Sequence, residues 1–75
     1  MRPDRACKRL ETLLGRRADG WVVVRVERDG FDIVVELVET TTKAAAEYWI
    51  NVFSPAGQAM VEQFEQMFST PISGE

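Results

Sequence analysis

The chain of 75 residues contains no histidine and a single cysteine, Cys7. Histidine is the commonest general base and metal ligand, and a cysteine without a histidine partner lacks the group that usually activates it. One cysteine also excludes an intramolecular disulfide, which is typical of a protein from a reducing compartment. We therefore expect a non-catalytic protein with no cofactor and no metal site, in which Cys7 is a small core residue on a helix.

Long apolar runs are missing as well. No segment approaches the ~20 apolar residues of a membrane span, and the charged start of the chain is not followed by the apolar stretch of a secretory signal. The hydrophobic content of 45% and charged content of 28% are ordinary for a soluble globular protein. We expect a small acidic protein in the cytoplasm, with one domain over residues 1–68 and a flexible tail over 69–75.

The strongest local signal is a β-hairpin. Residues 21–28 and 31–38 alternate in character and flank Asp29-Gly30, which fits a two-residue type I′ turn. Placing Arg28 opposite Phe31 gives the sheet one wholly aliphatic face, because side chains alternate between faces with a period of two. That face consists of Val22, Val24, Val26, Ile33, Val35 and Leu37.

A third strand is predicted over residues 47–53. Its residues Tyr48, Ile50 and Val52 would continue the aliphatic face, while Trp49 and Phe53 would join the opposite one. The apolar side chains expected on that opposite face are Trp21, Val23, Val34, Val38, Trp49 and Phe53.

Two helices are predicted outside the strands. Residues 3–15 are amphipathic, with Pro3 at a tolerated first position and Gly15 as a candidate cap. Near the other end, Ser54-Pro55 suits a helix start, and residues 58–68 are rich in helix formers. A fourth strand is the alternative there, because residues 54–57 also fit a type I turn with a glycine bulge, and Gly57 is unfavourable in a helical turn.

The fold class that follows is α+β, with a helix, a three-stranded antiparallel meander and a second helix, both helices lying on the aliphatic face. The opposite apolar face then has no cover. Removing apolar area from water is worth ~25 cal/mol per Å², and a domain this small gains much from association. We therefore expect a homodimer through that face, acting as a protein interaction or assembly module.

The first 17 residues are basic within an acidic chain, and they suggest a different function. They hold six basic side chains against Asp4 and Glu11, although the net charge of the chain is −3. Such a segment could contact phosphates in a nucleic-acid-associated accessory protein, but an acidic body makes nucleic acid the less favoured partner. The candidate phosphate contacts are Arg2, Arg5, Lys8, Arg9, Arg16 and Arg17.

Carboxylates on the open sheet face are the remaining chemical candidates. Glu27, Asp32 and Glu36 would lie near one another, and paired carboxylates can perform acid–base chemistry or hold a hard cation. No sequence feature indicates a cleft around them. We interpret them as solvated charges.

The order of elements is also that of double-stranded RNA-binding domains. That family uses a basic cluster at the start of its second helix, whereas residues 54–68 here have no lysine or arginine and include Glu62 and Glu65. This resemblance is one of topology only.

A second resemblance covers more of the chain. Leu13-Leu14-Gly15, the hairpin segments 29–31 and 35–39, Glu47-Tyr48 and Gly57 resemble the gas-vesicle synthesis protein O family. The resemblance implies a small accessory factor that acts in assembly through protein contacts. The chain lacks the arginine-rich ending typical of that family, and no functional residue is carried over.

Overall fold

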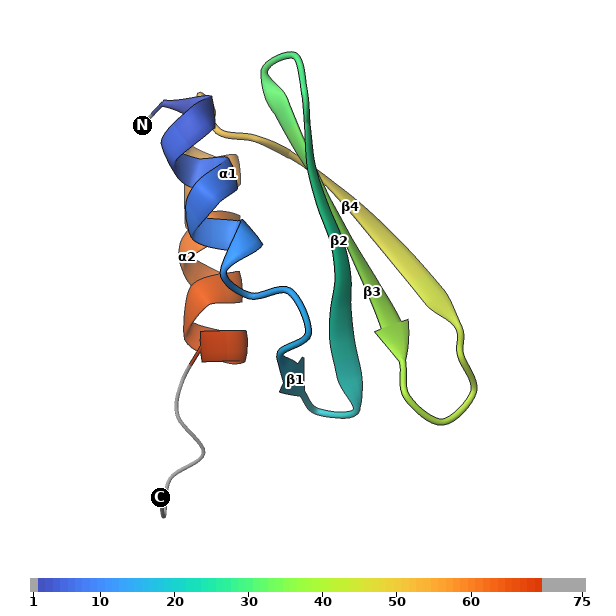
Figure 1. The fold of residues 1–75 in the computed structure, drawn as a ribbon. Coiled ribbons are helices and arrows are strands. Elements are labelled where there is room, and N and C mark those ends of the chain that lie inside the picture. Colours follow the sequence, from blue (N-terminus) through green and yellow to red (C-terminus); the bar gives the residue numbers. More distant parts are fainter. Residues whose placement is uncertain (1, 70–75) are drawn as a thin grey trace.

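A computed structural model describes residues 2–69, with Ser69 described by its backbone. The elements are α1 (Pro3–Glu11), β1 (Arg17–Ala18), β2 (Trp21–Asp29), β3 (Asp32–Glu39), β4 (Ala45–Asn51) and α2 (Pro55–Ser69). The strands form one antiparallel sheet in the order β1-β2-β3-β4, and both helices lie on the same face of it (Figure 1).

The α+β class is confirmed, with one strand more than predicted. The additional strand, β1, has two residues and pairs Arg17 with Val22 and Ala18 with Trp21. It lies between the first predicted helix and the hairpin, where no strand was predicted. The predicted domain boundary at residue 68 falls one residue before the end of α2, and residues 70–75 of the predicted tail lie outside the described residues.

The hairpin forms, but the predicted register is wrong by two residues. Asp29 pairs with Asp32 and Val26 with Val35, so the turn residues are Gly30 and Phe31. Gly30 has a φ of +65°, and Asp29 is not among the residues with positive φ. A two-residue turn with glycine first needs one left-handed residue, whereas the predicted type I′ turn needs two. The slip by an even number leaves residues 26–37 on their predicted faces.

A bulge at Val24 overturns the predicted faces in the first part of β2. The register shifts between Val23 and Arg25, so the residues before the shift exchange sides. Trp21 and Val23 therefore face the helices, where Val23 is 1% exposed, and Val24 is 46% exposed instead of buried. At the edge of β2 away from β3, the Val23 carbonyl accepts from the Gly15 N–H at 2.7 Å and the Val23 N–H donates to the Arg16 carbonyl at 3.1 Å, so the bulge accompanies contacts with the loop before β1.

The core lies between the sheet and the two helices. The predicted aliphatic face is confirmed for most of its length, because Ile33, Val35, Leu37, Ile50 and Val52 are buried together with residues of both helices, whereas Tyr48 is 40% exposed. The largest fully buried side chains are Leu10, Leu13, Ile33, Ile50, Val23, Val35, Val52 and Val61. α1 is shorter than predicted, since Leu13 and Gly15 belong to the turns that follow it and Gly15 has a φ of +81°.

The segment after β4 is a helix, so the predicted helix is confirmed and the alternative fourth strand is wrong. Ser54 caps it, because the Gly57 N–H donates to Ser54 Oγ at 2.9 Å. A Cβ atom at Gly57 would lie 1.8 Å from the Asn51 carbonyl oxygen. The glycine that seemed unfavourable for a helix therefore allows α2 to start directly against the end of β4.

Candidate interaction surface

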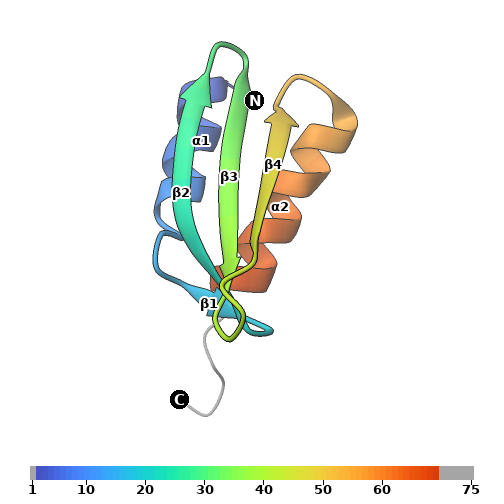
Figure 2. The ribbon, with the colours of Figure 1, turned by 90° about the vertical axis from the view of Figure 1, so that its right-hand side faces the viewer.

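The sheet face opposite the helices is covered by no element of the described residues, and Figure 2 views the molecule from this side. The long strands β2, β3 and β4 present side chains on it in cross-strand rows. We call it the open face. Its three central rows are Val22, Val38 and Ala45; Arg25, Glu36 and Glu47; and Glu27, Val34 and Trp49.

Arg25 is the centre of a charged cluster on the open face. Its Nε donates to Glu36 at 3.0 Å, its Nη1 lies 3.3 Å from Glu27, and its Nη2 bonds to Glu47. The hydrogen bond with Glu36 is the main cause that raises the pKa of Arg25 above its ordinary value. Three carboxylates share one guanidinium, so the middle of the face stays acidic.

The same cluster determines what the carboxylates can do. Of the predicted group, Glu27 and Glu36 meet at Arg25, while Asp32 lies at the end of β3 opposite Asn51. The guanidinium occupies the position where a cation would bind between these carboxylates. Within residues 2–69, no group of three or more histidine, cysteine or acidic residues is arranged to hold a metal ion.

Exposed aromatic side chains lie at the hairpin end of this face. Phe31 is 68% exposed, and Phe53 and Trp49 are each 55% exposed. The rings of Phe31 and Phe53 meet edge to face at 5.5 Å, and Trp49 Nε1 donates to Glu47 at 3.0 Å. Aromatic residues and arginine are enriched among the residues that dominate binding energy at protein interfaces.

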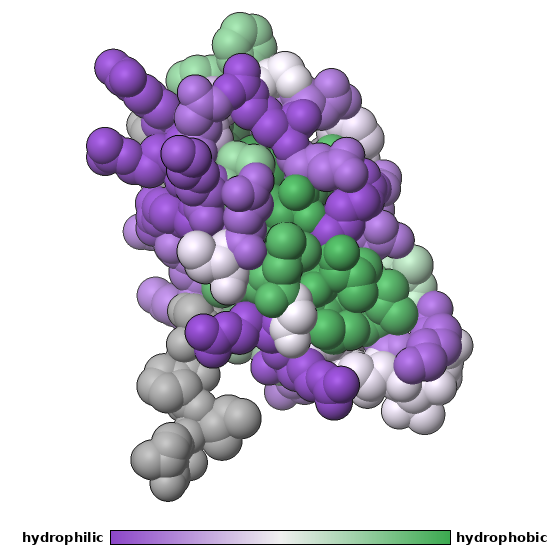
Figure 3. Space-filling view, in the orientation of Figure 1, coloured by the Kyte–Doolittle hydropathy of each residue, from purple (hydrophilic) through white to green (hydrophobic). Residues whose placement is uncertain are grey.

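A second apolar area lies around β2. Seen from the β2 side, a hydrophobic band crosses the lower half of the molecule between strongly polar regions (Figure 3). In this part of the chain Leu14 is 47% and Val24 is 46% exposed. Val22, half-buried, lies on the open face beside Val38.

The predicted interface residues therefore separate into three groups. Trp49, Phe53 and half-buried Val38 are accessible on or beside the open face. Val34 belongs to that face but is only 3% exposed, because the long side chains of its cross-strand neighbours Glu27 and Trp49 flank it. The remaining two, Trp21 and Val23, lie on the helix side.

Sequence reasoning missed Phe31 and Val22. Phe31 could have been found from the sequence, because a large aromatic residue next to a hairpin turn indicates an exposed apolar side chain. Val22 carried no such signal, because its place depends on the bulge at Val24.

The predicted phosphate contacts are only partly brought together. Arg2, Arg5, Lys8 and Arg9 line one shallow hollow on the outer side of α1, with Asp4 beside them. Arg9 also donates from Nε to Glu65 of α2 at 2.7 Å, which raises the pKa of its guanidinium, and Asp4 bonds to Arg28. Exposed Arg16 and Arg17 lie apart from this hollow, in the loop and in β1.

Cys7 is a core residue of α1, as predicted. It is 6% exposed, and its Sγ donates to Glu11 at 3.5 Å. Burial first, and then the Glu11 carboxylate, raise the pKa of the Cys7 thiol. Both effects disfavour the thiolate that nucleophilic chemistry requires.

Comparison of the chain with protein-family models, with curated proteins and with solved structures gave no significant match. The two resemblances noted from the sequence therefore stay predictions. Neither helix within residues 2–69 has the length and apolar character needed to cross a membrane.

Proposed function

We propose that this chain is a non-catalytic protein interaction or assembly module that forms a homodimer through its open face. The observation that carries the proposal is the exposure of Trp49, Phe53 and Phe31 on or beside a sheet face that neither helix covers. An accessory role in assembly, as the gas-vesicle resemblance implies, belongs to the same class. A reducing cytoplasm suits the single cysteine.

The composition of the open face supports a reversible contact. Obligate interfaces resemble a core cut in half, whereas reversible interfaces combine a few aromatic or arginine anchors with polar surroundings. Here the aromatic anchors stand beside the cluster around Arg25. We therefore expect a dimer that exchanges with monomer.

Charge gives this dimer a characteristic salt dependence. Glu27, Glu36 and Glu47 share Arg25, so two open faces that approach each other are both acidic. Salt screens such repulsion, with a Debye length of about 8 Å at physiological ionic strength. Homodimerisation should therefore strengthen when salt is added.

Sedimentation equilibrium tests the proposal. We expect the wild-type chain to be mainly dimeric at tens of micromolar, and Trp49→Lys and Phe53→Lys to be folded monomers. Ala59→Lys is the matched control, because it adds the same charge at an exposed position of α2. A monomeric wild type, or equal dissociation of all three variants, would contradict the proposal.

Nucleic-acid binding through α1 is the second candidate. It is favoured by one observation, the gathering of Arg2, Arg5, Lys8 and Arg9 around one hollow. Retention on heparin at physiological salt that is lost in the double variant Arg5→Ala and Lys8→Ala would support it. Its salt dependence is opposite to that of the dimer, since phosphate binding weakens as salt rises.

A further inference from the structure

The helix layer and the sheet diverge toward the end of the molecule that contains β1 (Figure 1). On the β2 side, β1 and the loop before it lie between the helices and the sheet, and a hollow of about 240 Å³ remains next to Ala18 and Trp21. Ala18 and Trp21 pack against the core there, and Gly15 and Arg16 bond to the Val23 backbone. No described element fills the corresponding space on the β4 side.

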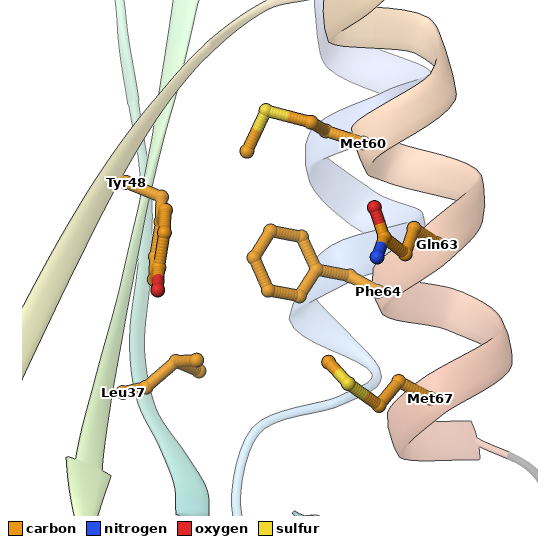
Figure 4. Close-up of a pocket in the computed structure, with 6 residues that line it drawn as sticks. All are labelled: Leu37, Tyr48, Met60, Gln63, Phe64 and Met67. Carbon is orange, nitrogen blue, oxygen red and sulfur yellow. The ribbon is translucent and has the colours of Figure 1, made fainter.

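The unfilled space on the β4 side is an apolar hollow of about 150 Å³ between β4 and α2. Figure 4 shows Tyr48 and Leu37 on the sheet side, facing Met60, Phe64 and Met67 on the helix. Tyr48 is 40% and Met67 39% exposed although their chemistry favours burial. Methionine side chains adapt readily to a bound group, so the hollow can accept apolar side chains of varied shape.

The hollow adjoins the free edge of the sheet. β4 pairs with β3 on one side, and its other side makes no backbone pairing within the described part of the chain. Natural edge strands are usually protected by proline, lysine, a bulge or a covering element. The β2 edge has a bulge and the pairing with β1, whereas residues 45–51 contain neither proline nor lysine and no bulge. The one described element beside this edge is α2, which lies in the helix layer and does not pair with β4.

The position of α2 indicates what fits at this edge. Figure 2 shows the N-terminal, orange half of α2 lying outside β4 when the sheet is viewed face on. A second copy would bring a whole helix layer to this side of the sheet, where the overhanging half of α2 already lies. A single extended peptide has no helix layer and fits beside β4 and beneath α2.

The charge beside β4 indicates the side chains of that peptide. Its residues on the helix side would meet the apolar hollow, and those on the open face would lie next to Glu47, whose side chain is 46% exposed. Glu47 shares Arg25 with two other carboxylates, so this surface favours a cation.

We propose that the free edge of β4 and the hollow under α2 bind an extended, unfolded segment of a partner protein by strand addition. The segment alternates apolar side chains, which enter the hollow, with basic ones, which lie on the open face near Glu47. Strand addition of this kind takes affinity from main-chain hydrogen bonds and specificity from pockets for alternate side chains. This site adjoins the homodimer contact at Glu47, and the proposal goes beyond that contact.

The probe is a capped heptapeptide of alternating lysine and valine, titrated into the full chain while backbone amide NMR shifts are recorded. We expect saturable shifts in residues 45–51 and in α2 between Met60 and Met67. Two methylated forms of the peptide are then compared. One carries methyl groups on the backbone nitrogens of the valines, and the other carries them on those of the lysines. In a strand that pairs through one edge, only every second backbone N–H points to the partner strand. Methylation of the N–H groups that point away should leave binding like that of the parent peptide, and methylation of the others should weaken it at least ~10-fold. Equal binding of both methylated forms would overturn the proposal.

Protein variants test the hollow itself. Met67→Lys should weaken binding of the parent peptide ~10-fold, while Ala59→Lys, which carries the same added charge elsewhere on α2, should leave it unchanged. Equal weakening would mean that charge alone drives binding. Removal of residues 70–75 gives a further outcome, because a ~10-fold gain in affinity would identify the chain's own terminal segment as the occupant and overturn the proposal.

The two proposals fail separately. Phe53→Lys removes the homodimer contact and leaves the β4 edge intact, so it should bind the peptide like the wild type. A dimer that binds no peptide contradicts only the edge site, and a monomer that binds it contradicts only the homodimer.

Discussion

The two faces of the sheet come from the same alternating strands and yet differ in kind. The helix side is filled by aliphatic side chains such as Ile33 and Ile50, each 0% exposed. The open face alternates apolar rows with the Arg25 row and keeps Trp49 more than half exposed. Side chains on the helix side must therefore fit a closely packed core, and they stabilise the fold. Side chains on the open face meet no such packing limit and stay accessible.

The largest effect should come from a cavity on the helix side. Ile50→Ala removes buried methyl groups from a fully enclosed site, and we expect it to lower the free energy of unfolding by about 2–5 kcal/mol. Urea denaturation measures this value. Val22→Ala, at a half-buried position of the open face, is the control and should cost much less. Similar losses of unfolding free energy in the two variants would contradict the difference between the two faces.

A somewhat smaller loss is expected where α2 meets the sheet. Replacing glycine by alanine inside a helix ordinarily gains up to about 1 kcal/mol. At Gly57 the added Cβ would collide with the Asn51 carbonyl oxygen, so Gly57→Ala should instead destabilise the fold by about 1–3 kcal/mol. Thermal unfolding compared with Ala59→Gly provides the check. Stabilisation by Gly57→Ala would show that α2 does not begin against β4.

The cluster on the open face predicts a salt-dependent effect on stability. Arg25→Met leaves Glu27, Glu36 and Glu47 without their shared cation, so the melting temperature should fall at pH 7. Salt screens the repulsion among these carboxylates, so the difference from wild type should shrink as the salt concentration is raised. A difference that is equal at low and high salt would mean that Arg25 acts through packing alone.

The smallest effect concerns Glu39, at the end of β3. Hydrogen bonds from Thr42, and also the Thr41 N–H, hold the pKa of this carboxyl below its ordinary value. A lowered folded-state pKa stabilises the fold above the unfolded pKa, about 4.3, and this contribution is lost as the pH falls through the folded value. Glu39→Gln should therefore lower the melting temperature slightly at pH 7 and less at pH 3.

Equal shifts of the Glu39→Gln melting temperature at both pH values would contradict that reading. Thr41→Ala is the control variant, because it keeps the backbone N–H that donates a hydrogen bond to the Glu39 carboxylate.

Much of the fold could be read from local signals. Alternation located the three long strands, and Ser54-Pro55 located the start of α2. The misplacement of Trp21 and Val23 has a non-local cause, since the bulge at Val24 accompanies bonds from Val23 to Gly15 and Arg16. Gly57 also has a non-local role. The sequence pattern counted it against a helix, because its close approach to the Asn51 carbonyl exists only in the folded chain.

The sequence predicted that the open face carries aromatic and aliphatic side chains, but it predicted less well which residues lie there. Trp49, Phe53 and Val38 keep their predicted places because they follow the regular part of the sheet. Val34 is buried although it lies on the open face. Its long cross-strand neighbours Glu27 and Trp49 flank it, and the alternating sequence pattern does not predict how far such side chains extend over a neighbour.

The most direct test of the open face as a contact surface is an isotope-filtered NOE measurement on a mixture of labelled and unlabelled chains. If the open face is the contact, the aromatic protons of Trp49 and Phe53 should give intermolecular NOEs. Intermolecular NOEs confined to α1, or none at concentrations of hundreds of micromolar, would contradict it.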